Sequence, residues 1–461
     1  MVKNRQYVNF NLELRDYDES NQTFKISVPF SEVGETRKAV TVSYPSKEIE
    51  PISASDAEKT REAVLIEGVE KQFRKLERKR LSPQELIELG KQLTIRLFPP
   101  GEISNLFQKA VERAGSEGGV RLRLVIKDLK LAQIPWEFCY LPQENEEDSY
   151  DNFLVLNPKY SMVRYESTAT STHPIKKDNQ ESLRLLAVTA NPWKDLDLDV
   201  EQEAIEKALD GFSVDGVTLN WELFIKNPTF EELTSALDKK PDLFHFAGHG
   251  AFTEEDNNSN TEEFKGMGHL VLLNKEKQPE LLPANHLAKQ LQMAGVKVAL
   301  LGACESGRRD GVSPWTGIAP ALMKEGIPAV VAMQYKVRDD DAIVFSKRFY
   351  TALASGLSID EAVSLGRLEM YRQSKERFEW GIPVLYMRSP DGIIFPELTQ
   401  RESKTADELR IKGEARVNEL KDSTFNVVEI EKVVKANQIQ GNYEGEKVEN
   451  SNVKVVFIKE A

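Results

Sequence analysis

Two side chains with the chemistry of a nucleophile and a base stand at the ends of two apolar runs. The run 243–247 leads into His249, which lies between two glycines, and the run 296–301 is followed by Gly302 and then Cys304. In open α/β sheets the carboxyl ends of the strands form the crevice in which ligands bind. If the two runs are neighbouring strands, the imidazole and the thiol meet in that crevice.

The chemistry that these residues offer is attack by a thiolate on a carbonyl. A free thiol is only a few per cent ionised at neutral pH, and an adjacent imidazole raises its nucleophilic fraction. The negative charge that develops on the attacked carbonyl needs backbone N–H donors close by, and glycine allows a close approach. The sequence therefore predicts Cys304 as nucleophile, His249 as base, and the N–H groups of Gly250 and Cys304 as the oxyanion hole.

The surrounding sequence predicts an α/β sandwich that would hold these residues. Nearly continuous apolar runs alternate with helical segments, as a mostly parallel sheet covered on both faces requires. Thr229 and Glu232 form the pattern of a capping box at the start of one of these helices. The runs lie at 183–188, 243–247, 296–301, 329–333 and 384–387.

Four regions differ in the pattern of their polar and apolar residues and are predicted as separate units. Residues 1–55 alternate polar and apolar positions, which is typical of half-buried strands, including one antiparallel pair. Residues 56–168 predict an α+β supporting or pseudo-protease-like region, in which Ser82 caps a helix that begins at Pro83. After a polar linker comes the α/β domain, 180–396. Residues 400–461 predict a charged helix followed by a small β-containing interaction module.

Composition excludes several classes of protein. The 461 residues contain two cysteines and carry a net charge of -13, so we expect no disulfide framework, no cysteine-rich metal site and no direct nucleic-acid binding. We also expect no membrane segment and no signal peptide, and a cytoplasmic location. The basic run 71–80 is interpreted as a solvated helix face. No phosphate-binding glycine motif follows a strand, which argues against a nucleotide-binding domain.

The two motifs resemble those of CHAT-domain proteins, the bacterial caspase- and separase-related peptidases of clan CD. The 55 residues from His249 to Cys304 also agree with the caspase spacing, in which the histidine lies about 50 residues before the cysteine. Segments 326–333, 349–362 and 380–386 continue the resemblance, which covers about 180–395. The motifs themselves are His245-Phe246-Ala247-Gly248-His249-Gly250 and Gly302-Ala303-Cys304-Glu305-Ser306-Gly307.

The resemblance implies a caspase-like three-layer sandwich and a cysteine endopeptidase that needs no cofactor. It further implies a regulated effector in a bacterial signalling or defence pathway, with a protein or peptide substrate. A regulatory or adaptor protein is expected to act through the flanking regions. The alternative, a catalytically silent CHAT scaffold that binds proteins, stays open because an occluded site would have the same sequence.

The sequence indicates the substrate preference less clearly than it indicates the catalytic pair. In caspases the residue two before the nucleophile is a glutamine, and in Arg/Lys-specific relatives it is typically an aspartate, whereas this chain has Gly302. Neither preference therefore carries over. Residues 339–341 are three aspartates that either face a basic substrate side chain or begin a helix, where carboxylates are favoured. The candidate pocket consists of Gly302, Glu305, Met333, Gln334 and Tyr335.

Two further residues have chemistry that the pair does not use. Cys139 lies among Trp136, Phe138 and Tyr140 and is expected in a core. His245 shares a strand face with His249, because side chains alternate along a strand. It is either a neighbour that supports His249 or a buried histidine with its own hydrogen bond.

Overall fold

The computed structural model describes most of the chain up to Pro396. The predicted helix and strands of 400–461 lie outside the described residues. The described residues are 5–44, 69–142, 147–165, 182–194, 198, 203, 213–214, 217–254, 266–303, 315–335, 337–375 and 377–396.

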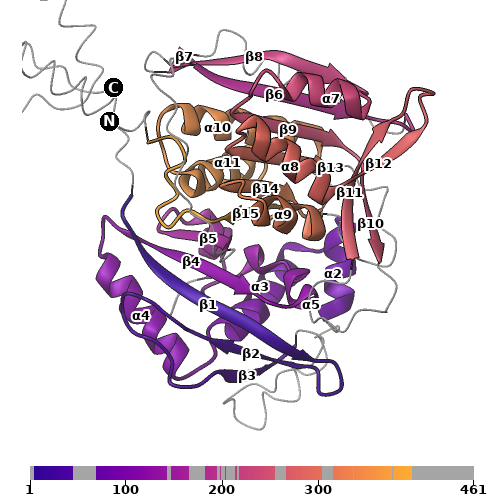
Figure 1. Cartoon of the computed structure of the whole chain (residues 1–461). Helices are drawn as coiled ribbons and strands as arrows, with labels where there is room; N and C mark the ends of the chain where they lie inside the picture. The colour runs from indigo at the N-terminus through magenta and orange to yellow at the C-terminus, as the bar shows by residue number, and fades with distance from the viewer. Residues whose placement is uncertain are drawn as a thin grey trace, which may run out of the picture. The chain divides into compact units, whose positions relative to one another are not determined.

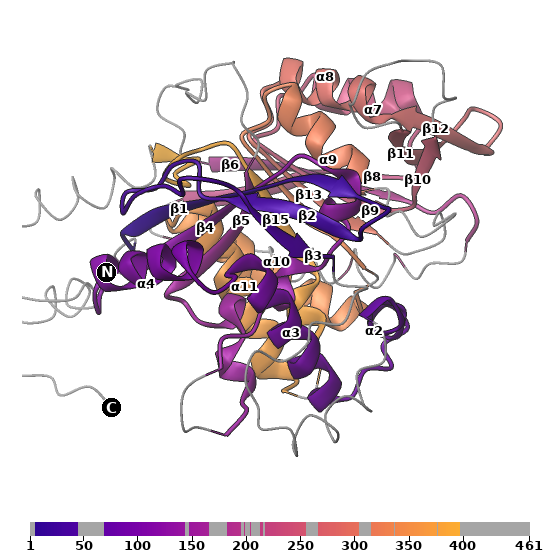
Figure 2. The same cartoon turned by 90° about the horizontal axis from the view of Figure 1, so that it is seen from below.

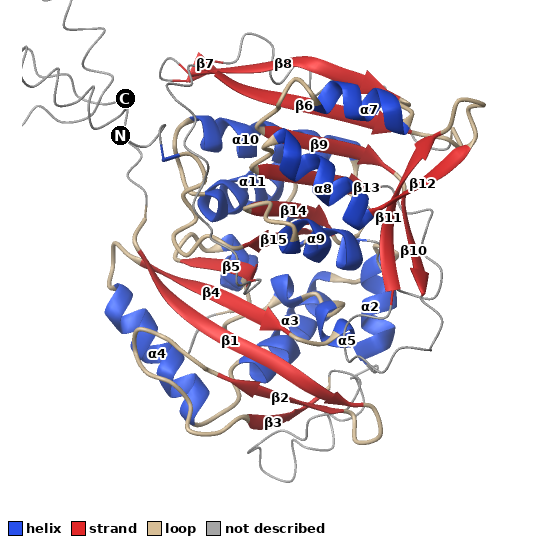
Figure 3. Ribbon diagram, in the orientation of Figure 1, coloured by secondary structure: helices blue, strands red, loops and turns tan. Residues whose placement is uncertain are grey.

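One sheet of twelve strands runs through the described part of the chain, as the red arrows of Figure 3 show. Most neighbours are parallel. The antiparallel pairs are β1 with β2, β2 with β3, β14 with β15, and β7 with β8. In order across the sheet the strands are β3 (Val40–Ser43), β2 (Thr23–Ser27), β1 (Tyr7–Asp18), β4 (Gly119–Ile126), β5 (Tyr160–Tyr165), β15 (Pro383–Met387), β14 (Ala329–Met333), β13 (Val298–Ala303), β9 (Leu243–Gly248), β6 (Ser182–Ala190), β8 (Val217–Lys226) and β7 (Ser213–Val214).

The burial of each strand follows from its sequence pattern. In β1 the alternating residues Val8, Phe10, Leu12 and Leu14 are buried and the residues between them are partly exposed, so only one face of this strand is fully covered. In β9 every residue is buried. The continuous apolar run predicted for a doubly covered strand is therefore found where the sheet has helices on both faces.

Helices cover both faces of the central strands. Figure 2 shows α8 and α9 on one side of the sheet and α10 and α11 on the other. The predicted three-layer α/β sandwich with a mostly parallel central sheet is thereby confirmed. The helices are α2 (Val69–Glu77), α3 (Pro83–Leu97), α4 (Glu102–Ala114), α5 (Leu129–Ala132), α7 (Phe230–Leu237), α8 (Ala284–Ala294), α9 (Trp315–Lys324), α10 (Asp339–Ala354) and α11 (Ile359–Gln373), with short 3-10 helices at η1 (Trp136–Phe138), η2 (Tyr150–Asn152), η3 (Leu154–Leu156) and η4 (Glu379–Gly381).

Two predicted helix starts are confirmed, and each has a capping box. Ser82 precedes α3, its hydroxyl accepts from the Glu85 N–H, and the Glu85 carboxylate accepts from the Ser82 N–H. Thr229 and Glu232 exchange the same pair of bonds at the start of α7. These reciprocal bonds satisfy N–H groups that a helix start leaves without a partner, so both helix starts are encoded locally. None of the helices in the described residues is both long enough and apolar enough to cross a membrane.

A second, three-stranded antiparallel sheet follows directly after β9. It consists of β10 (Gly250–Glu254), β11 (Gly266–Leu273) and β12 (Pro279–Pro283), in that order. Figure 1 shows it at the right-hand end of the central strands. It therefore lies at the edge of the main sheet where β9 ends and His249 follows.

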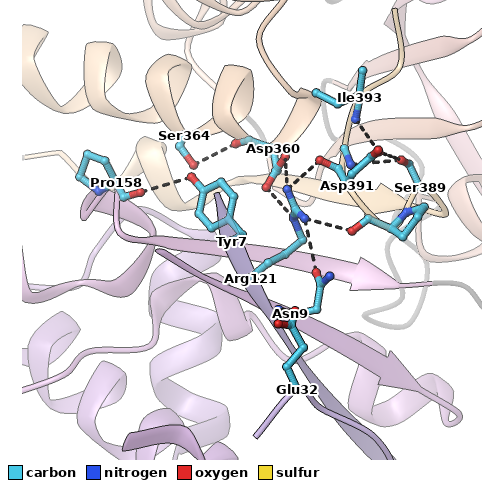
Figure 4. Close-up of polar contacts among 12 residues, drawn as sticks. Tyr7, Asn9, Glu32, Arg121, Pro158, Asp360, Ser364, Ser389, Asp391 and Ile393 are labelled. Atoms are coloured by element: carbon cyan, nitrogen blue, oxygen red, sulfur yellow. Dashed lines mark hydrogen bonds and ion pairs between the residues drawn. The ribbon is translucent and has the colours of Figure 1, made fainter. Parts of the chain in front are cut away.

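The N-terminal strands belong to the same sheet as the α/β core. β5 pairs in parallel with β15, so that Arg164 lies opposite Tyr386. The buried guanidinium of Arg121, on β4, also contacts Asp360, on α11, in the cluster drawn in Figure 4. The predicted linker at 168–181 lies outside the described residues, and the division into domains at 55, 168 and 396 stays a prediction.

Candidate active site

The strands that precede His249 and Cys304 are direct neighbours. β9 and β13 pair in parallel, with Ala247 opposite Gly302 and Gly248 opposite Ala303. His249 is the residue after Gly248, and Cys304 is the residue after Ala303. Neighbouring strands lie about 4.8 Å apart. Cys304 and Glu305 themselves lie outside the described residues.

The face of the sheet on which these residues stand follows from the strand period. Phe244 and Phe246 of β9, with Ala299 and Leu301 of β13, belong to the apolar core beneath α7, α8 and α9. Alternate residues point to opposite faces. His245 and Gly302 therefore belong to the opposite face, the one that α10 covers.

Gly248 fits a place where no larger residue does. A Cβ atom there would lie 2.5 Å from the carbonyl oxygen of Ala190, its register partner on β6. The glycine before His249 therefore allows β6 and β9 to approach each other at their carboxyl ends. The first glycine of the Gly-His-Gly motif is therefore required by strand packing as well as by the proposed chemistry.

The carbonyl of His249 anchors the start of the second sheet. It accepts a hydrogen bond from the Val271 N–H at 2.9 Å, and the next pair in the register is Gly250 with Leu270. In an antiparallel ladder, hydrogen-bonded and non-hydrogen-bonded pairs alternate. Since the pair at 249 and 271 is bonded, the Gly250 N–H is directed away from β11.

The imidazole of His249 is fully buried, with 0% of the residue exposed, and the indole of Trp193 packs against it. The two ring centroids are 4.6 Å apart and the rings are inclined at 74°, an edge-to-face contact. Trp193 itself is 47% exposed. This contact could not be predicted from the sequence, since nothing in the pattern around residue 193 points to position 249.

His245 has its own buried hydrogen bond. Its Nδ1 lies 3.0 Å from the hydroxyl of Tyr350, on α10. Burial lowers the pKa of His245 to about 4, so the ring is neutral near pH 7. Of the two alternatives for His245, the structure supports the buried, hydrogen-bonded histidine.

The pocket candidates after β14 are held by neighbouring segments. Met333 and Tyr335 are buried. The Gln334 side-chain amide donates to the carbonyl of Gln133 at 2.9 Å, and its backbone N–H donates to the carbonyl of Ile382 at 3.1 Å. Gln334 therefore connects the end of β14 to the region before the α/β core. Gly302 is partly buried, and the pocket as a whole stays a prediction.

The aspartates at 339–341 begin a helix. α10 starts at Asp339, and both Asp340 and Asp341 pair with Arg377, at 2.8 and 3.2 Å. Burial, together with the carboxylates of Glu379 and Asp340, raises the pKa of Asp341. These contacts favour the helix-start interpretation over a contact with a basic substrate side chain.

The second cysteine is an inert core residue, as predicted. Cys139 is fully buried, and burial raises the pKa of its thiol well above the usual value. A thiol in this state has almost no thiolate and little reactivity. Among the residues that the structure describes, no cluster of three or more His, Cys, Asp or Glu side chains could hold a metal ion.

The fold and the paired strand ends define an α/β sandwich with a candidate Cys–His site at the carboxyl edge of its sheet. Residues 88–422 match the model of the CHAT domain, which is more than half of the chain. The chain belongs to the CHAT-domain family, and the resemblance seen in the sequence is confirmed. No curated protein matches it.

The chain is similar to solved structures that include a cysteine proteinase and separase. The Arg-specific cysteine proteinase gingipain R is 13% identical over 63% of this chain and 68% of its own, with a TM-score of 0.37. Separase, in the separase–securin complex of Saccharomyces cerevisiae, is 14% identical over 83% of this chain, with a TM-score of 0.38. The chain spans 30% of the separase chain. At this identity neither relation transfers a function.

Proposed function

We propose that the chain is a cysteine endopeptidase of clan CD, in which Cys304 is the nucleophile and His249 the base. The observation that carries this proposal is the parallel register of Gly248 with Ala303. Because His249 and Cys304 are the next residues in the sequence, this register supports a site in which the two lie at the ends of adjacent strands. If the strand alternation extends by one residue, both side chains point to the same face of the sheet.

The reaction follows from these two groups. His249 accepts the proton of the Cys304 thiol, and the thiolate sulfur attacks the carbonyl carbon of the scissile peptide bond. The negative oxygen of the tetrahedral intermediate accepts hydrogen bonds from the N–H groups of Gly250 and Cys304. His249 then gives its proton to the leaving amine as the C–N bond breaks. Water, activated by the same imidazole, releases the acyl group from sulfur.

The direction of the Gly250 N–H supports its part in this scheme. Because it points away from β11, it is not used by the ladder that begins at this residue. A substrate carbonyl at the outer edge of β10 is therefore within the reach of this donor. Its partner donor, the Cys304 N–H, would lie at the end of the adjacent strand.

We further propose that the peptidase is regulated and acts in the cytoplasm on a protein or peptide substrate. The full burial of His249 supports regulation, because a base that is covered in the resting chain needs a rearrangement before substrate reaches it. The same burial is compatible with the second candidate function, a silent CHAT scaffold. The small number of cysteines supports a reducing compartment. A role in bacterial signalling or defence rests on the family alone.

The deciding experiment compares four proteins on a peptide library and a cell lysate. These are the wild type, Cys304→Ala, His249→Ala and the matched control Cys139→Ala. We expect cleavage by the wild type and the Cys139 variant, and none by the other two. Cleavage that persists in both site variants would rule out the assignment. A wild type that remains silent in every lysate, with a Cys304 thiol that no covalent probe modifies, would favour the scaffold.

A further inference from the structure

A short turn after β6 holds Trp193 in place. The Asn191 N–H donates to the side-chain carbonyl of Asn227 at 2.8 Å, and the Lys194 N–H donates to the Asn191 carbonyl at 3.3 Å. Lys194 has a left-handed backbone, with φ of 56°. Asn227 is in turn bonded to the Thr189 carbonyl through its own N–H. The indole is therefore carried by a turn that is tied to the ends of both β6 and β8.

This turn brings the indole against the candidate base. The edge-to-face contact between Trp193 and His249 has a centroid distance of 4.6 Å. The terminal torsion of a histidine has a broad energy profile, so an unconstrained imidazole samples many orientations. A large aromatic ring packed against it at this distance excludes the orientations that would overlap the indole. The contact therefore favours one orientation of the ring that must face Cys304.

His249 and Trp193 differ strongly in their exposure to solvent. His249 is fully buried, whereas nearly half of Trp193 faces solvent. Trp193 is one of four large apolar residues in the described chain that stand out as exposed. An indole placed in this way separates the imidazole from water while it keeps one side of its own surface open.

We propose that Trp193 is a positioning residue for His249. It holds the imidazole in the orientation that receives the proton of the Cys304 thiol. In that step the S–H bond breaks, its electron pair stays on sulfur, and an N–H bond forms on His249. Trp193 exchanges no proton. This inference rests on the proposed function of the pair.

The test uses two variants of similar size that differ in aromatic character. Trp193→Leu keeps an apolar side chain but has no ring, and Trp193→Phe keeps a ring. For each variant we would measure the alkylation rate of Cys304 by iodoacetamide, with peptide mapping to separate it from Cys139, together with kcat and KM for a cleaved peptide. Alkylation reports the thiolate without any contribution from substrate binding.

The expected result is a split between the two variants. Trp193→Leu lowers both the alkylation rate and kcat by about three- to tenfold, with KM nearly unchanged. Trp193→Phe stays close to the wild type in all three quantities. Thermal unfolding of each variant shows whether a loss arises from the fold instead, and the partial exposure of Trp193 makes a folded Leu variant the expected outcome.

Two results would overturn the inference. If Trp193→Leu raises KM and leaves alkylation unchanged, the indole contacts substrate and does not position the base. If it changes none of these quantities, the contact has no role in the reaction. Failure of the proposed function has a different signature, because Cys304 in the wild type would then be alkylated no faster than an ordinary thiol, and Cys304→Ala would retain cleavage.

Discussion

Arg121 and Asp360 form a buried, two-point ion pair between β4 and α11. The guanidinium Nε lies 2.8 Å from one carboxylate oxygen, and Nη2 lies 3.2 Å from the other. The same guanidinium donates to the carbonyls of Pro390 and Asp391, and Figure 4 shows it between Asp360 and Asp391. One side chain of β4 therefore holds both α11 and the segment that follows β15.

We expect Asp360→Asn to destabilise the protein by about 3–5 kcal/mol, because it leaves the charge of Arg121 buried without a counter-charge. Urea unfolding monitored by circular dichroism measures the change. The matched control is Glu369→Gln on the same helix. Its pair with Arg372 is 3.5 Å long and solvent-exposed, so the change in stability should stay below about 0.5 kcal/mol. Equal effects of the two substitutions would contradict the role assigned to the buried pair.

Acid should destabilise the fold in two stages. Burial lowers the pKa of His245 from 6.5 to about 4, so the unfolded chain binds this proton more readily, and stability falls as the pH drops from about 6.5 toward 4. Burial alone would raise the pKa of Asp360, but Arg121 outweighs it and holds that pKa below the usual value. The contribution of Asp360 is therefore present above its unfolded pKa and is lost as the pH falls below about 3.8.

The test of the first stage is the variant His245→Gln. Between pH 6.5 and 4 its free energy of unfolding should vary less than that of the wild type, by on the order of 3 kcal/mol at most. Stability measured by urea unfolding at several pH values gives both curves. Identical slopes in this window would show that His245 does not carry the effect.

Gly248→Ala should disable the proposed site without a change to His249 or Cys304. Its methyl group would meet the Ala190 carbonyl at 2.5 Å, which pushes β9 from β6 one residue before His249. We expect a loss of at least about tenfold in kcat/KM, since small misplacements of reacting groups have large effects on rate. Gly366→Ala is the control, because its methyl group meets the Phe345 ring between α10 and α11. That variant should lose stability but keep most of the activity per folded molecule.

Cys139 should be unreactive in the folded protein. Its burial and raised pKa leave almost no thiolate, so a disulfide reagent should label it only after denaturant is added. Counting labelled thiols in the Cys304→Ala variant isolates this residue. Rapid labelling of the native variant would mean that the core around Trp136 and Tyr140 opens more readily than its packing indicates.

Much of the α/β core could be predicted from the sequence, because its signals are local. Each signal is contained in a short stretch of sequence. These signals are the apolar runs, the caps at Ser82 and Thr229, and the small residues at the tips of β9 and β13. The adjacency of the two tips is only a condition of the predicted site, because the rule that ligands bind at the carboxyl ends of parallel strands does not say which strands are neighbours. The register of β9 with β13 meets that condition.

The remaining features depend on contacts between distant parts of the chain. The bond from His245 to Tyr350 spans 105 residues, and the contact from Trp193 to His249 depends on a turn set by Asn227. The pairing of β5 with β15 is of the same kind, because a strand pattern indicates that a strand exists but not which edge it joins. No short segment of the sequence contains both partners of such a contact, so these features could not be predicted from local patterns.

The place of β15 in the sheet has a consequence for biosynthesis. It lies between β14 and β5, so β5 lacks this neighbour until residues 383–387 have left the ribosome. Throughout that interval the strands made first present an open edge, which is the kind of surface on which nascent chains pair with one another. A chain terminated shortly before residue 383 would keep open edges on both β5 and β14, and we expect such a product to be recovered in inclusion bodies.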